Sequence, residues 1–89
     1  MGYDVLYSDN ARKNLKKIDR FQAQIIISWI EKNLIGCYDP RLHGKPLEYG
    51  IKGLWRYRVG NYRIIADIQD NLVRIEIFRA GHRREVYND

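Results

Sequence analysis

The stretch WRYRVGNYRIIADI, residues 55–68, constrains the fold of this 89-residue chain more than any other segment. Apolar and polar side chains alternate on both sides of Gly60-Asn61, and this pair suits a tight hairpin turn with positive φ angles. We therefore predict two antiparallel strands, Leu54–Val59 and Tyr62–Ile68. Any fold proposed for the chain has to contain this hairpin.

Two further strands extend the predicted sheet. Leu72–Ala80 alternates in the same way after a turn at Asp70-Asn71, so it completes a three-stranded antiparallel meander. Tyr3–Tyr7, near the other end of the chain, is predicted to be a short first strand. Residues 36–53 contain two prolines and four glycines and are predicted to be a connecting loop.

Two amphipathic helices are predicted between the first strand and the loop. The first has a narrow apolar stripe of Ala11, Leu15 and Ile18, and its candidate N-caps are Ser8, Asp9 and Asn10. The second begins after Asp19, and its apolar face consists of Phe21, Ile25, Ile26, Trp29, Ile30 and Leu34. The segment IIISWI also fits a buried strand, but the helical period and the stop at Gly36 favour a helix.

The order of these elements indicates a single α+β domain over residues 1–89, in which two helices pack on one face of the sheet and the other face stays partly open. Because side chains alternate along a strand, each residue of the hairpin can be assigned to a face. The side chains predicted to face the helices are Trp55, Tyr57, Val59, Ile64, Ala66 and Ile68. Those predicted on the open face are Arg56, Arg58 and Arg63.

The charge of the chain indicates what this open face could bind. There are 16 Lys and Arg residues against 11 Asp and Glu residues, a net charge of +5, and arginine dominates the second half. A guanidinium group binds phosphate through two parallel hydrogen bonds, so a polyanionic partner is the leading expectation. The alternative is a solvated face whose arginines pair across strands with Asp67 and Glu76.

Several other kinds of chemistry do not fit. His43 and His82 lack metal-ligand spacing, and no phosphate-binding glycine-rich loop or nucleophile–base pair is recognisable, so no metal and no cofactor are expected. The single cysteine, Cys37, cannot form an internal disulfide and is expected to have no chemical role. Without a signal peptide or membrane-spanning pattern, a cytoplasmic location is expected.

The segment RAGHRREVY, residues 79–87, places polar side chains just past the predicted last strand. The unperturbed pKa of a histidine lies near neutrality, so His82 is a candidate general acid or base. Arg83 could neutralise a phosphate, and Tyr87 could stack on a nucleobase. A histidine in a loop is also often an ordinary surface residue, and that interpretation stays open.

The segments HGKPL, WRYRVGNYRII and GHRREVY, in this order and at this spacing, resemble the RelE/ParE superfamily of toxins from toxin–antitoxin pairs, and most closely its RelE branch. The resemblance covers nearly the whole chain. It implies the fold of a small microbial ribonuclease and a metal-independent endoribonuclease that cleaves messenger RNA in the ribosomal A site. It also implies a cognate RelB-like antitoxin, and a hetero-oligomeric complex that binds operator DNA through the antitoxin.

The same resemblance implies roles for individual residues. The catalytic positions fall on Arg56, Arg58, Arg63, His82, Arg83 and Tyr87. Arg84 is an alternative to Arg83, and Lys52 and Arg84 are expected to contact RNA.

Which residue transfers the proton stays open. The best-known relative has lysines where Arg56 and Arg58 stand, and an arginine effectively cannot lose its proton. His82 is therefore the better acid or base candidate, and Glu48 is a weaker one that resembles a glutamate of a neighbouring branch.

The expected reaction is attack of a ribose 2′-hydroxyl on the adjacent phosphate, which leaves a 2′,3′-cyclic phosphate and a 5′-hydroxyl. Two other readings remain open. One is a ParE-like toxin that inhibits DNA gyrase by protein contact and cleaves nothing. The other is a catalytically silent module that binds RNA or the ribosome.

Overall fold

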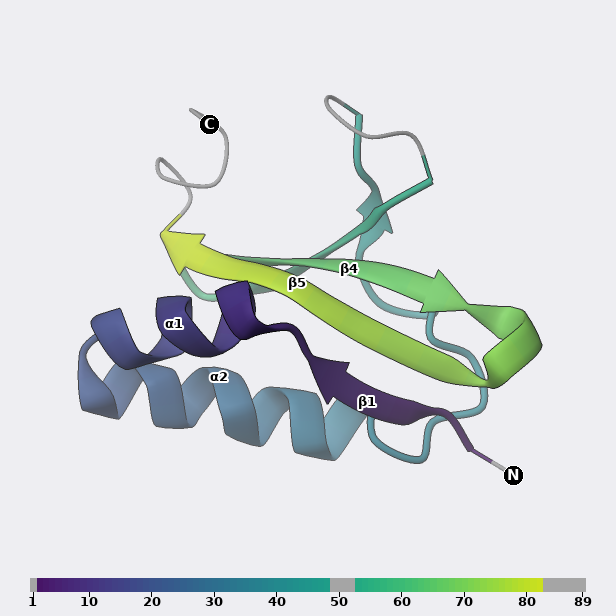
Figure 1. Cartoon of the computed structure of the whole chain (residues 1–89), viewed down its shortest axis with the longest axis horizontal. Coiled ribbons are helices and arrows are strands. Elements are labelled where there is room, and N and C mark those ends of the chain that lie inside the picture. Colours follow the sequence, from purple (N-terminus) through teal and green to yellow (C-terminus); the bar gives the residue numbers. More distant parts are fainter. Residues whose placement is uncertain (1, 49–52, 83–89) are drawn as a thin grey trace.

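A computed structural model of the chain describes residues 2–48 and 53–82. Its elements are β1 (Asp4–Tyr7), α1 (Asp9–Lys17), α2 (Arg20–Asn33), β2 (Lys45–Pro46), β3 (Trp55–Val59), β4 (Tyr62–Gln69), a 3-10 turn (Asp70–Leu72) and β5 (Arg74–His82). The strands form one sheet in the order β1-β5-β4-β3-β2, with β1 parallel to β5 and the other neighbours antiparallel. Both helices lie on the same side of the sheet (Figure 1), which confirms the predicted α+β fold.

Side-chain caps determine where both helices begin. Ser8 Oγ accepts a hydrogen bond from the amide of Ala11 at 3.0 Å, and Asp19 Oδ2 accepts from the amides of Phe21 and Gln22. These bonds satisfy amides that have no partner inside a helix. The predicted cap at Asp19 is confirmed, and of the three candidates for the first helix the cap is Ser8. Neither helix of the described ranges is long and apolar enough to cross a membrane.

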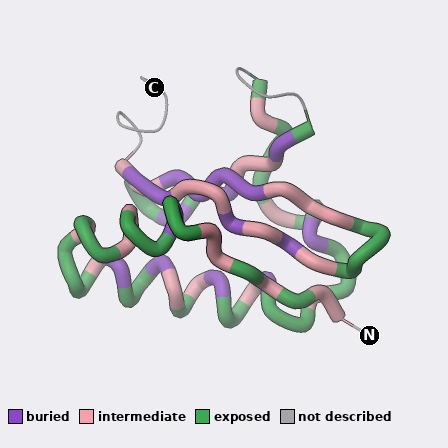
Figure 2. The backbone as a smooth tube through the Cα atoms, in the orientation of Figure 1, coloured by how far each residue is buried: buried purple, intermediate pink, exposed green. Residues whose placement is uncertain are grey.

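The core lies between the helices and the sheet face that they cover. Tyr57 of β3 and Ile64 of β4 are fully buried, and Ile26 and Ile30 of α2 belong to the same apolar cluster. Figure 2 shows buried positions recurring along the central strands and along α2. Val59 of β3 and Ala66 of β4 also belong to this cluster, and this membership confirms which side of the hairpin faces the helices.

Part of the predicted apolar face of α2 is wrong. Phe21 is 70% exposed and Ile25 is 42% exposed, whereas Ala23, Ile26 and Ile30 are buried. The helix presents only one stripe to the sheet, because residues three and four apart share a helix face. Phe21 and Ile25 lie on the next stripe and leave apolar surface facing away from the sheet.

The last strand begins and ends later than predicted. It runs from Arg74 to His82 and not over residues 72–80. The 3-10 turn and the left-handed backbone of Val73, with φ of 49°, delay its start. The sequence had placed His82 in the segment after the last strand. In the structure, His82 is the last residue of the strand itself.

A β-bulge interrupts β5 at Phe78. The pairing between β4 and β5 shifts between Ile65 and Ala66, and Phe78 is left without a partner in β4. The Phe78 carbonyl instead accepts hydrogen bonds from Ser8 Oγ and Asn10 Nδ2, both at 3.1 Å. Beyond such an extra residue, the side chains of a strand exchange faces.

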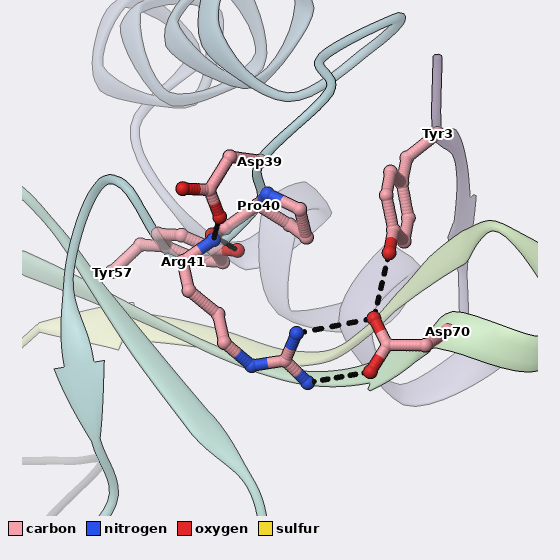
Figure 3. A network of polar contacts seen from close by, with 6 residues as sticks. All are labelled: Tyr3, Asp39, Pro40, Arg41, Tyr57 and Asp70. Carbon is pink, nitrogen blue, oxygen red and sulfur yellow. Dashed lines mark hydrogen bonds and ion pairs between the residues drawn. The ribbon is translucent and has the colours of Figure 1, made fainter. Parts of the chain in front are cut away.

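Polar contacts tie the loop before β2 to the rest of the fold (Figure 3). Arg41 donates to both carboxylate oxygens of Asp70, at 3.1 and 3.0 Å, and Tyr3 OH donates to the same carboxylate at 2.6 Å. The buried hydroxyl of Tyr57 donates to the Pro40 carbonyl at 2.6 Å, and burial raises the pKa of Tyr57, so the hydroxyl keeps its proton. The loop is thus held against both β3 and the β4–β5 turn.

Removing the buried hydroxyl of Tyr57 tests this attachment. Tyr57→Phe leaves the Pro40 carbonyl without its partner, and we expect the free energy of unfolding to fall by about 1–3 kcal/mol in urea titrations. Tyr38→Phe is the matched control, because Tyr38 is 80% exposed, and it should change stability by less than about 0.5 kcal/mol. Equal stability of Tyr57→Phe and wild type would contradict the assigned contact.

The Asp70 carboxylate should make stability depend on pH in the acidic range. Hydrogen bonds from Arg41 and then from Tyr3 hold the pKa of Asp70 below its usual value, so its contribution is present above about pH 4 and is lost as the pH falls through the folded-state pKa. Urea titrations at descending pH should show a smaller loss of stability for Asp70→Asn than for wild type. Asp4→Asn controls for the loss of one exposed carboxylate, and identical acid dependence of Asp70→Asn and wild type would refute the linkage.

Candidate functional site

The sheet face away from the helices carries the three arginines of the hairpin. Arg58 of β3 pairs directly with Arg63 of β4, and the next pair along the strands is Tyr57 with Ile64. Since Tyr57 and Ile64 lie in the core, Arg58 and Arg63 point to the opposite face. Arg56, two positions from Arg58, has the same orientation.

Arg63 is buried although it does not face the helices. Arg63 is 5% exposed, and its Nε has no hydrogen-bond partner among the described residues. The one hydrogen bond assigned to its side chain there is a long one, from an Nη to the Tyr62 carbonyl at 3.4 Å. A buried charged donor without a partner is costly, so this guanidinium is suited to receive an anion.

The pairing of Arg58 with Arg63 is unfavourable by itself. Residues directly opposite in antiparallel strands have Cβ atoms about 5 Å apart, and like charges in this position destabilise a sheet. Within residues 2–48 and 53–82, no acidic side chain forms an ion pair with either arginine. An anion bound between them would remove the repulsion and supply the missing acceptor.

The acidic residues of the meander lie at the other end of the face. Gln69 Nε2 donates to Asp67 at 3.0 Å and to Glu76 at 3.2 Å, and Arg74 donates to Gln69 Oε1 at 2.8 Å. Asp67 follows Arg63 by four residues, about 13 Å along a strand. This exceeds the Debye length of about 8 Å at physiological ionic strength. The alternative considered from the sequence, pairing with Asp67 and Glu76, is therefore wrong for Arg58 and Arg63. For Arg56, whose partner Ile65 is two residues from Asp67, it stays a prediction.

His82 lies on the helix side of the sheet. It pairs with Tyr62, and the two rings are 5.8 Å apart at an angle of 78°. Both border a cavity of about 250 Å³ that is also lined by Lys17 and Asp19, at the end of α1. The next pair, Arg63 with Gly81, faces the other way. The predicted position of His82, just past the last strand, is wrong, because β5 continues through residue 82.

The structure says less about the remaining candidates from the sequence. Glu48 is exposed, in the loop after β2. Lys52, Arg83, Arg84 and Tyr87 lie outside the described residues. Burial raises the pKa of the Cys37 thiol, which disfavours the reactive thiolate form.

Two basic residues of this face were missed from the sequence. Lys45 of β2 pairs with Arg56, and Arg79 of β5 pairs with Ile65. Partners in neighbouring strands share a face, so both join the arginines. A strand of two residues has too little alternation to be recognised, and the bulge at Phe78 reverses the simple alternation that would have placed Arg79.

The chain thus belongs to the class of small α+β domains in which a helical hairpin covers one face of the sheet, and arginines gather on the other face. Residues 5–87 match the family described as ParE toxin of type II toxin-antitoxin system, parDE. The chain belongs to this family, and its predicted place in the RelE/ParE superfamily is confirmed.

Individual relatives agree with this membership over the full length. Toxin RelG of Mycobacterium tuberculosis is 29% identical over 87 residues, which cover 98% of each chain. Toxin RelE of the same organism is 28% identical over 85 residues, 96% of this chain and 86% of the relative.

Solved structures show the same fold. A chain in the crystal structure of the toxin–antitoxin complex RelBE2 from M. tuberculosis aligns with a TM-score of 0.83 and 28% identity, covering 93% of both chains. A mutant of E. coli toxin RelE in the free state aligns with a TM-score of 0.76 at 20% identity, over 99% of this chain and 93% of that one. The second similarity supports the fold alone.

Replacing the buried guanidinium tests whether Arg63 is held at a cost in stability. Arg63→Met keeps a similar volume but removes the unpaired charge, so the free energy of unfolding should rise by about 1–3 kcal/mol in chloride buffer. Phosphate added at constant ionic strength should raise the melting temperature of the wild type and not that of Arg63→Met. Arg12→Met, on the exposed surface of α1, is the matched control. A destabilised Arg63→Met that still responds to phosphate would contradict this account.

Proposed function

We propose that this type II toxin is a ribosome-dependent endoribonuclease, which cleaves messenger RNA in the A site, inhibits translation and acts in the cytoplasm. The observation that carries the proposal is the opposed pair Arg58 and Arg63, of which Arg63 is buried with an unpartnered Nε. A phosphodiester suits such a pair, because each guanidinium can bind two phosphate oxygens. The relatives named RelG and RelE support a RelE-type activity.

In the proposed reaction, the 2′-oxygen of a ribose attacks the adjacent phosphorus and the bond from phosphorus to the 5′-oxygen breaks. The products are a 2′,3′-cyclic phosphate and a 5′-hydroxyl. Arg58 and Arg63 stabilise the negative charge that develops on the phosphoryl oxygens, and Arg56 adds positive charge beside them. DNA is no substrate, because it lacks the 2′-hydroxyl. The arginines supply the positive charge, so the reaction is proposed to be metal-independent.

Proton transfer falls to other groups, since an arginine does not lose its proton. From the family resemblance, we propose that Tyr87 orients the substrate and that Arg83 contacts the phosphate. Two candidate bases, Glu48 and His82, lie within the described residues. The position of His82 on the helix side speaks against its acting on the phosphate that Arg58 and Arg63 hold.

We also propose a RelB-like antitoxin, which forms a hetero-oligomer with this toxin and lets it bind operator DNA. An apolar groove of about 360 Å³ lies between the helices and β1, lined among others by Tyr7, Leu15, Ile27 and Ile35. Such a groove suits the apolar side of an amphipathic helix. Relatives crystallised as toxin–antitoxin complexes support this partner.

Primer extension on ribosomes programmed with a defined message tests the activity. Wild type should produce discrete in-frame cuts, and Arg58→Gln and Arg63→Gln should each lower the rate about 10²–10³-fold. Tyr87→Phe should also suppress the cuts, and adding the cognate antitoxin should abolish them. Lys13→Gln, on the exposed surface of α1, is the control. Cutting at the wild-type rate by both arginine variants would remove the proposed site.

The description of the matching family as ParE toxin favours a second candidate, a DNA gyrase inhibitor without nuclease activity. Induced expression of the toxin in cells, followed by primer extension on message and an assay for DNA breaks, separates the two. Gyrase-dependent DNA breaks with intact message would support the second candidate. Intact message and intact DNA would leave the catalytically silent binding module.

A further inference from the structure

The basic face is wider than the site that cleavage itself requires. Lys45, Arg56, Ile65 and Arg79 are successive cross-strand partners, and so they form one row across β2, β3, β4 and β5. Neighbouring strands are about 4.8 Å apart, so the three steps of this row span about 14 Å. A row of that width extends past a single phosphate group and reaches the neighbouring phosphates of the same strand.

A glycine holds Lys45 at one end of the row. Gly44 has a φ of +81°, and a Cβ on it would collide with the carbonyl oxygen of Arg56, so the chain can approach β3 this closely only at glycine. The indole Nε1 of Trp55 donates to the His43 carbonyl at 2.7 Å and fixes the same segment. Although β2 has only two residues, Lys45 is thus held in register beside Arg56.

The β-bulge places Arg79 at the other end. Ile77 is buried in the core, so strict alternation would point residue 79 towards the helices. The extra residue, Phe78, puts Arg79 opposite Ile65 on the open face. Two side chains at the start of α1, Ser8 and Asn10, stabilise the bulge by hydrogen bonds to its carbonyl.

We propose that Lys45 and Arg79 bind the phosphates on either side of the scissile one, so that the RNA strand crosses the sheet perpendicular to its β-strands. The inference rests on the proposed function and extends it. Arg58 and Arg63 form the adjacent row and hold the scissile phosphate near the middle of the path. Lys45 and Arg79 touch no reacting atom. They raise affinity equally before and during the reaction, and they therefore act on KM and not on kcat.

Salt dependence of RNA binding tests the two contacts. The probe is a fluorescent 2′-O-methyl RNA oligonucleotide, which cannot be cleaved, bound by the full chain over a series of sodium chloride concentrations. Each phosphate contact contributes about 0.7 to the slope of log K against log salt for a single strand. Lys45→Gln and Arg79→Gln should each lower the slope by about this amount. Their matched controls on the exposed surface of α1 are Lys13→Gln and Arg12→Gln.

Each outcome is decisive. Slopes that fall for Lys45→Gln and Arg79→Gln, a wild-type slope for Lys45→Arg, and a KM for ribosome-bound message that rises several-fold at constant kcat support the inference. Wild-type slopes for both glutamine variants overturn it and leave the ribonuclease proposal standing. Lowered slopes without any cleavage by the wild type support the phosphate row and refute the ribonuclease. Failure of the wild type to bind the oligonucleotide overturns the inference.

Discussion

Arg58 and Arg63 stand opposite each other because the core leaves the hairpin no other register. Tyr57 and Ile64, the next pair, are fully buried, and a slip of either strand by one residue would expose one of them and turn the arginine of that strand towards the helices. The apolar core therefore holds together two cations that repel each other, one of them buried without a partner for its Nε. Under the proposed function, this cost in stability leaves both guanidinium groups available to an anion.

The charges of the open face are separated along the strands, and this separation orients a bound polyanion. Arg58 and Arg63 lie near the β3–β4 turn, while Asp67 and Glu76 are joined through Gln69 about 13 Å from them along the strands. Lys45, Arg56 and Arg79 lie between the two ends, in register with Ile65. A phosphate chain is attracted to the first end and repelled from the second. The apolar groove lies instead between the helices and β1. The proposed RNA and the proposed antitoxin would thus bind to two chemically different surfaces of the toxin.

Local sequence patterns were enough to predict the hairpin, both helices, the cap at Asp19 and the shared face of the three arginines, and they limited the other cap to three candidates, of which it is Ser8. What they could not predict depends on contacts between distant segments. Arg79 changes face because the start of α1 stabilises a bulge in β5, and Lys45 joins the face because Gly44 lies against the backbone of Arg56. The position of His82 was missed because the end of β5 is set by pairing with β4. The roles of the residues past His82 stay predictions.

A crystal structure of the toxin with an RNA that carries a 2′-O-methyl group at the cleaved nucleotide tests the central claim most directly. The account predicts that the uncleaved phosphate lies between Arg58 and Arg63, with oxygens about 2.7–2.9 Å from guanidinium nitrogens and one of them accepting from Arg63 Nε. A phosphate bound on the helix side beside Tyr62 and His82, with Arg63 Nε still unpartnered, would contradict it.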